Sequence, residues 1–162
     1  MDESEKLIQQ ASQQMSEGEY QQAFSKFDKA IKANPNNAEA YFGKAEAGVL
    51  LQKVSAEEIV ALYKKAISLD PKDPFYYSSL ASFCMEAGQF NEAESAYNKA
   101  AEVDPDVAPY YFTEFAVEYN RRAPEVMEQF LDDTTRAMIK KKSLTYLLKS
   151  IGMPADEAKK LL

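Results

Sequence analysis

An internal repeat of 34 to 36 residues runs through most of this chain and restricts the folds open to it. Pro35, Pro71 and Pro105 each close a segment of the same pattern, at intervals of 36 and 34 residues. Repetition at this period predicts one small structural unit per repeat, each stacked on its neighbours. Within each segment, a small or aliphatic residue is followed by an aromatic residue and then by Ala: Ala23/Phe27/Ala30, Ile59/Tyr63/Ala66 and Ala93/Tyr97/Ala100.

Each repeat is predicted to fold as two antiparallel helices. Steps of four and three residues place the repeated side chains on one helical face. The proline ends that helix because it lacks an N–H group and clashes with the preceding turn. An apolar helix precedes it, most clearly at Tyr41/Ala45 and Tyr77/Leu80 and more weakly at Leu7/Ala11. Residues that start or stop helices agree with this division: Gly18, Gly88, Asn37, Ser55, and Asp73 with Pro74.

This pattern resembles the tetratricopeptide repeat, whose period is 34 residues and whose second helix carries an Ala, an aromatic residue and a closing Pro. The second repeat departs from it by two extra residues, which we assign to the turn at 52–55, and by Ile59 in place of a small residue. The resemblance implies an all-α fold. We expect an α-solenoid of three antiparallel helix pairs in a right-handed superhelix with a concave face, closed by carboxyl-terminal capping helices.

Two parts of the chain follow from this assignment. Residues 121–162 leave the repeat pattern and are expected to form a helical cap or tail. Pro124 is expected to open one helix there, Ser143 to cap a second, and Pro154 to open a third after Gly152. The tail either covers the last repeat, docks on a partner or a second copy, or folds back into the chain's own groove. The solenoid is expected over 4–120, with repeats at about 4–37, 38–73 and 74–107 and an extra helix at 107–120.

Composition narrows the possible chemistry. The chain has no His, which excludes His-based metal sites and Ser–His or Cys–His nucleophiles. We expect no cofactor, no metal and no enzymatic activity. Cys84 is the single cysteine, which is typical of a reducing compartment, and we expect a cytoplasmic protein. The best candidates for catalytic residues are four acids, although carboxylates spaced in this way are more typical of a solvent-exposed helix. They are Glu125, Glu128, Asp132 and Asp133.

Charge and hydropathy argue against two classes of partner. The net charge is −7, from 19 basic and 26 acidic residues, and an acidic protein repels the phosphates of nucleic acid. The charge is uneven, because residues 1–120 carry −10 and residues 121–162 carry +3. No stretch approaches the ~20 apolar residues of a membrane helix, so we expect no membrane insertion.

The resemblance also implies where a partner would bind. In this family the residue just after the large core residue of each first helix faces the concave side, as do residues four and seven positions further on. The groove predicted by this count is largely apolar. It would hold an apolar peptide or an amphipathic helix of another protein. The expected groove residues are Ile8, Ser12, Met15, Phe42, Glu46, Val49, Phe75, Ser78, Ser82, Met85, Phe112 and Tyr119.

These observations predict a non-catalytic adaptor, scaffold or assembly factor. The alternative is a self-associating module that forms a homodimer through residues 123–162. The family's well-known clamp for acidic chaperone termini uses Lys, Asn and Arg, and none is present at the matching positions here. We therefore do not expect this chain to act as that clamp. Those positions are Ile8, Ser12, Gly43, Phe75 and Ser79.

Overall fold

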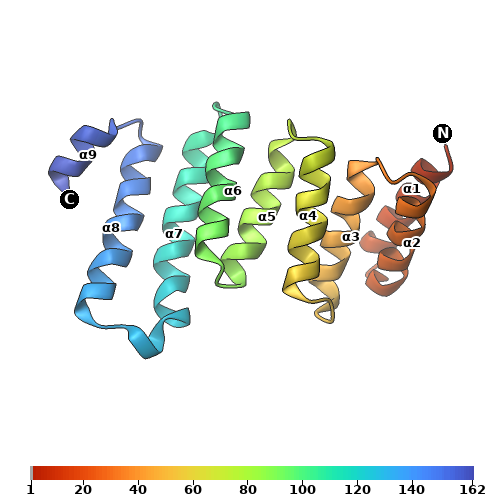
Figure 1. Ribbon diagram of the computed structural model, residues 1–162, viewed down its shortest axis with the longest axis horizontal. Coiled ribbons are helices and arrows are strands. Elements are labelled where there is room, and N and C mark those ends of the chain that lie inside the picture. The colour runs from red at the N-terminus through yellow and green to blue at the C-terminus, as the bar shows by residue number, and fades with distance from the viewer. Residues whose placement is uncertain (1) are drawn as a thin grey trace. The chain divides into compact units, whose positions relative to one another are not determined.

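The structure is a computed structural model that describes residues 2–162, and within them the chain is helical with no strand (Figure 1). This confirms the all-α class. None of the helices in these residues is long and apolar enough to cross a membrane. The helices are α1 (Glu3–Ser16), α2 (Tyr20–Ala33), α3 (Ala38–Leu51), α4 (Ala56–Leu69), α5 (Pro74–Glu86), α6 (Phe90–Val103), α7 (Ala108–Val126), a short 3-10 helix η1 (Glu128–Phe130), α8 (Asp133–Ser150) and α9 (Ala155–Leu161).

The chain divides into two compact units at a point inside α5. The first unit ends at Tyr76 and the second begins at Tyr77. Helix α7 continues without a break across the boundary expected at 120, as far as Val126. The assignment of residues 121–162 as a carboxyl-terminal helical cap or tail stays a prediction.

The first unit consists of α1 to α4 and the first turn of α5. Helices α1 and α2 pack together as a pair, and α3 packs on both of them. A close contact lies at the centre: a Cβ atom added to Gly43 would stand 2.3 Å from the ring of Phe27, which is 2% exposed. Small residues therefore let α3 approach α2. The core cluster contains Ile8, Ala11, Ala23, Phe27, Ala30, Ala40 and Ala47.

The ends of these helices follow the local sequence. Gly18 and Gly88 take positive φ angles of 79° and 74° after α1 and α5, as expected for glycines that end a helix. In the second pair Gln52 has a positive φ of 52° instead. Relative to the third repeat, the two extra residues are divided: α3 is one residue longer than α5, and the turn at 52–55 is one residue longer than the turn at 87–89. The side chains of Asn37 and Ser55 cap α3 and α4.

An ion pair links α2 to α3. The carboxylate of Asp28 lies 2.7 Å from the ammonium of Lys32 and 2.8 Å from that of Lys44. Lys44 is well covered, since its side chain is 14% exposed and its ammonium lies 4.9 Å from the ring centre of Phe24. Hydrogen bonds from Lys32 and Lys44 lower the pKa of Asp28. The pair therefore stabilises the packing of α3 on α2 while Asp28 is ionised.

This arrangement predicts a pH-dependent loss in the Asp28→Asn variant. Because the folded-state pKa of Asp28 lies below its unfolded value, the stabilisation is present at neutral pH and is lost as the pH falls through the folded-state pKa. We expect the variant to lose ~0.5–1 kcal/mol of unfolding free energy at pH 7, since the carboxylate is a third exposed. Urea unfolding at neutral and acidic pH measures this. An equal difference in unfolding free energy between wild type and variant at both pH values would contradict this prediction.

The second unit is centred on the aromatic ring of Phe115 in α7. Phe115 is fully buried, and its ring centre lies 6.2 Å from Tyr97 of α6, 5.3 Å from Tyr119 of α7 and 4.4 Å from Tyr146 of α8. Pro124 was expected to open a helix, and that expectation was wrong. It lies in the last turn of α7, where its missing N–H group removes one backbone hydrogen bond and the helix ends two residues later.

Helix α8 is longer than the sequence suggested. Asp132 caps it by accepting a hydrogen bond from the Thr135 N–H at 2.7 Å. Ser143, expected as a cap, instead lies in mid-helix and is 5% exposed. Gly152 ends the helix with a φ of 77°, and α9 follows with Asp156 and Glu157 in its first turn, as expected.

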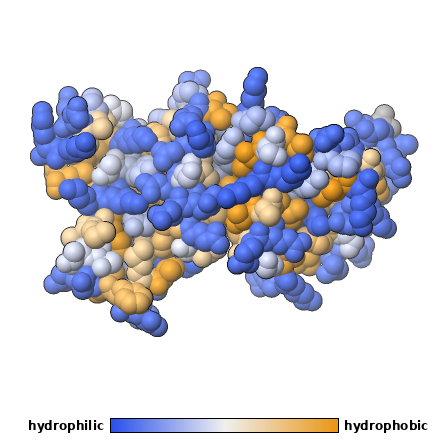
Figure 2. Space-filling model, in the orientation of Figure 1, coloured by the Kyte–Doolittle hydropathy of each residue, from blue (hydrophilic) through white to orange (hydrophobic). Residues whose placement is uncertain are grey.

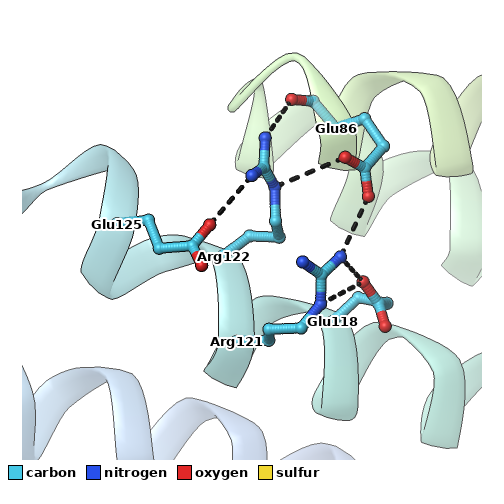
Figure 3. A network of polar contacts seen from close by, with 5 residues as sticks. All are labelled: Glu86, Glu118, Arg121, Arg122 and Glu125. Carbon is cyan, nitrogen blue, oxygen red and sulfur yellow. Dashed lines mark hydrogen bonds and ion pairs between the residues drawn. The ribbon is translucent and has the colours of Figure 1, made fainter.

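A network of ion pairs fastens α7 to the end of α5 (Figure 3). The Arg122 guanidinium donates to the backbone carbonyl of Glu86 at 2.6 Å and to the carboxylate of Glu125 at 2.9 Å. Arg121 lies 3.0 Å from the Glu86 carboxylate and also pairs with Glu118. Arg122 thus satisfies a carbonyl that the end of α5 leaves without a helical partner. This pair of basic residues therefore has a structural role.

Candidate functional site

An aromatic cluster is the most prominent part of the predicted groove in the first unit. The ring centre of Phe42 lies 5.9 Å from Tyr63, 5.4 Å from Phe75 and 4.9 Å from Tyr76. We call these four residues the aromatic cluster. They come from α3, α4 and the start of α5, where Pro74 opens the helix and the Asp73 carboxylate accepts from the Phe75 N–H at 2.9 Å. The cluster combines two buried rings, Tyr63 and Tyr76, with the exposed ring of Phe75.

Exposure within the cluster is graded. Tyr63 and Tyr76 are 2% and 8% exposed, Phe42 is half-buried, and Phe75 is 59% exposed. The Tyr63 hydroxyl donates to the Glu46 carboxylate at 2.5 Å, which fixes that side chain beside the rings. Phe75 therefore presents an exposed aromatic face that packs against the ring of Phe42, and a ligand can cover it at little conformational cost.

The other groove residues predicted in the first unit differ in accessibility. Ser12 is exposed, and Met15 and Val49 are half-buried. Ile8 is 4% exposed and belongs to the core cluster with Phe27, so it is not accessible to a ligand. The prediction placed Leu7 on the core side of α1, but Ile8 is the more deeply buried of the two. The expected face is therefore displaced by one residue in this helix.

In the second unit the structure covers several of the predicted residues. Met85 and Tyr119 are 1% and 7% exposed, which corrects their assignment as ligand contacts. Helix α8 provides part of this cover: the Lys142 ammonium lies 5.5 Å from the Tyr119 ring centre, and the Lys149 ammonium lies 4.1 Å from that of Phe112. Phe112 is half-buried. Ser78 is half-buried as well, and Ser82 is exposed.

A polar cluster between α6 and α8 was not predicted. The Tyr146 hydroxyl donates to the Glu94 carboxylate at 2.8 Å and accepts from the Asn98 amide at 2.8 Å. Lys142 pairs with Glu94 at 2.7 Å, and Lys149 donates to Asn98 at 2.8 Å. Burial raises the pKa of Tyr146 and lowers that of Lys149. Because these residues are 48 to 52 positions apart, no local motif in the sequence signals their meeting.

Two of the four acids considered for catalysis, Asp132 and Glu125, have structural contacts instead. Asp132 caps α8, and this backbone hydrogen bond lowers its pKa. Glu125 pairs with Arg122 at 2.9 Å. Within residues 2–162, no three acidic or cysteine side chains come together in a group that could hold a metal ion. Cys84 is buried in the second unit.

Curated proteins with similar sequences are tetratricopeptide-repeat proteins. The chain is 33% identical over 102 residues to the small glutamine-rich tetratricopeptide repeat-containing protein 2 of Mycosarcoma maydis, covering 63% of this chain and 28% of that protein. It is 32% identical over 105 residues to the protein of the same name from Saccharomyces cerevisiae, covering 65% and 30%. The chain therefore spans less than a third of the length of these relatives.

Solved structures show the same fold at low sequence identity. A crystal structure of MamA matches with a TM-score of 0.73 and 17% identity, covering 99% of this chain and 82% of that one. The first repeat domain of Spaghetti (RPAP3), bound to the HSP90 peptide SRMEEVD, matches with a TM-score of 0.59 and 20% identity, covering 63% and 79%.

Sequence models of the repeat itself agree with the helix pairs described above. One model described as tetratricopeptide repeat matches residues 8–74, and a second with the same description matches residues 50–113. Together they cover the three repeats that the Ala, aromatic and Pro spacing marks out. Through residues 8–113, this chain belongs to the tetratricopeptide-repeat family.

Proposed function

We propose that this chain is a non-catalytic protein-binding module that holds an apolar or amphipathic segment of another protein. The observation that carries the proposal is the aromatic cluster, where the exposed ring of Phe75 packs against Phe42, which in turn packs against Tyr76. A large aromatic side chain held in place by its neighbours is a common anchor at protein interfaces. The family supports this reading, since its curated relatives are repeat proteins and a solved structure of the same fold holds a peptide.

The chemistry of the cluster favours an apolar ligand over an acidic terminus. The peptide in the Spaghetti structure, SRMEEVD, carries several carboxylates. In this chain, Ile8 is buried and Gly43 lies against the Phe27 ring, so neither position leaves room for a basic side chain. Glu46 beside the rings would also repel a carboxylate. The segment that fits is therefore apolar at its centre, with a basic or neutral residue next to Glu46.

A charge placed on the exposed ring tests this proposal. We expect Phe75→Glu to weaken capture of the partner from an extract of the source cells at least tenfold, because burying one aromatic ring contributes ~1.5–3 kcal/mol. Quantitative mass spectrometry of the captured proteins measures the ratio. The matched control is Tyr110→Glu, since Tyr110 is also 59% exposed and lies in α7. Equal loss with both variants, or no loss with either, would contradict the proposal.

A further inference from the structure

A second apolar surface lies in the other unit, between α7 and α8. It is a hollow of about 360 Å3, which we call the end groove. Its apolar side chains are accessible: Val117 is 53% exposed, Leu144 is 47% exposed and Leu147 is 37% exposed. Ser143 at its base is 5% exposed, and its hydroxyl has no hydrogen-bond partner among residues 2–162. The groove is lined by Ala116, Val117, Asn120, Lys140, Ser143, Leu144 and Leu147.

In the first unit, the equivalent groove of the α1–α2 pair is filled by a helix. There α3 packs on the α1–α2 pair, and α2 meets it with Phe24 against Gly48, Phe27 against Gly43 and Asp28 against Lys44. The buried residues of α2 and α8 have the same spacing, Ala23/Phe27/Ala30 in one and Ile139/Ser143/Tyr146 in the other. In this register the residues of α8 that correspond to Phe24, Phe27, Asp28 and Ile31 are Lys140, Ser143, Leu144 and Leu147.

The end groove is therefore the place where a further first helix would pack. The chain's own last helix does not fill it. Helix α9 packs on a different face of α8, where a separate hollow is lined by Lys141, Thr145 and Lys149 from α8 and by Ala158 from α9. Leu144 and Leu147 remain exposed in the presence of α9. On the face shown in Figure 2, hydrophobic side chains of the α8–α9 end are also visible between hydrophilic ones.

The shape of the groove indicates what kind of helix it takes. In the first unit the large Phe27 faces Gly43, which has no side chain. In α8 the position of Phe27 holds the small Ser143, which leaves depth for a large apolar side chain on the incoming helix. The unpartnered Ser143 hydroxyl can accept a hydrogen bond there, for example from an indole N–H.

The charge of the groove indicates an acidic occupant. Lys140 lines it and Lys141 follows, and the ammonium group of neither has an acidic partner among the described residues. Helix α8 carries five basic residues and one acidic residue. Two copies of this helix face to face would repel each other. A second copy offering its first helix fits no better, because the outer face of α1 is polar and exposed at Lys6, Gln9, Gln10 and Gln13.

We propose that the end groove binds an amphipathic helix of a partner protein, with a large apolar residue over Ser143 and acidic residues beside Lys140. This site is independent of the aromatic cluster, and it makes the chain a bridge between two proteins. The leucines supply apolar area, and the lysines select acidic over basic helices.

Designed peptides test the proposal directly. One probe is a helical peptide with Leu at alternating three- and four-residue spacing, one central Trp and Glu at the flanking positions. The second probe has Lys in place of Glu. The chain contains no Trp, so peptide fluorescence reports binding alone. At low salt we expect the acidic peptide to bind at least tenfold more tightly than the basic one.

Variants locate the site. We expect Leu144→Glu/Leu147→Glu to weaken binding of the acidic peptide at least tenfold. Lys140→Glu, a milder surface change, should reverse the preference toward the basic peptide. Met138→Glu is the matched control, since Met138 is 66% exposed on α8 but does not line the groove, and binding should be unchanged. Phe75→Glu should also leave it unchanged, which separates this site from the aromatic cluster.

Three results would overturn the proposal. The first is equal binding of the two peptides by the wild-type chain. The second is a Leu144→Glu/Leu147→Glu variant that binds like Met138→Glu. The third is a wild-type chain of doubled mass by light scattering that returns to single mass in Leu144→Glu/Leu147→Glu, because the groove would then hold a second copy.

Discussion

Phe115→Ala is expected to lower the unfolding free energy by ~3–5 kcal/mol, the range typical of a large aromatic residue removed from a core. Phe115 is fully buried and touches the rings of Tyr97, Tyr119 and Tyr146, so one ring joins α6, α7 and α8. Alanine would lose these contacts and leave a cavity that rigid helices close only in part. Urea unfolding followed by circular dichroism measures the loss.

The control for this variant is Phe130→Ala, because Phe130 is 77% exposed. We expect that change to alter stability by less than ~0.5 kcal/mol. A Phe115→Ala protein within ~1 kcal/mol of the wild type would show that the second unit does not depend on this ring. It would then contradict the packing described for α6, α7 and α8.

Gly43→Ala is expected to destabilise the first unit by ~1–3 kcal/mol, although alanine favours a helix over glycine by about 1 kcal/mol. The added Cβ atom would stand 2.3 Å from two ring atoms of Phe27. Phe27 is 2% exposed among the residues of the core cluster, so its ring cannot turn away cheaply. The added atom can therefore be accommodated only if α3 moves away from α2, and that movement exposes apolar surface that is buried in the wild type.

Gly48→Ala supplies a matched comparison in the same helix. Its added Cβ atom would meet Phe24, Ile59 and Val54 at 3.4 to 3.5 Å, an ordinary contact distance. Helix propensity then decides whether the substitution stabilises the protein, and we expect a gain of ~0.5–1 kcal/mol in unfolding free energy. In the Gly43→Ala background, Phe27→Leu should recover part of the loss. Equal effects of the two glycine substitutions would contradict the close packing of α2 and α3.

The second helices of the three repeats were predictable from sequence because their spacing is strict. Ala23, Ala66 and Ala93 are fully buried, and Phe27, Tyr63 and Tyr97 are each 2% exposed. Such a pattern sets both the helix and the face that it buries. The residues that end helices, Gly18 and Gly88, were equally clear because a positive φ suits glycine.

The binding face was less predictable because it rests on counting from a chosen core residue. In α1 the count started from Leu7, and the deeper burial of Ile8 shows that the start was wrong. Met85 and Tyr119 failed for another reason: side chains far away in sequence cover them, such as Lys142 over Tyr119. Periodicity gives the direction of a side chain but not what packs over it.

The fourth helix pair was missed for a similar physical reason. Helix α8 places Ser143 and Tyr146 where the other second helices have an aromatic residue and Ala, so the signature is absent although the buried spacing is kept. The run Lys140-Lys141-Lys142 also interrupts the apolar pattern. Lys140 lines the end groove and Lys142 pairs with Glu94, which are tertiary roles that the local sequence does not show.

The most direct test of the protein-binding claim is photo-crosslinking in the source cells, with a photoreactive phenylalanine analogue incorporated at position 75. We expect a covalent adduct between this chain and another protein at position 75. We expect much less of that adduct when the analogue is placed at position 110, whose side chain is equally exposed. Adducts of equal yield at both positions, or none at position 75, would contradict a binding site at the aromatic cluster.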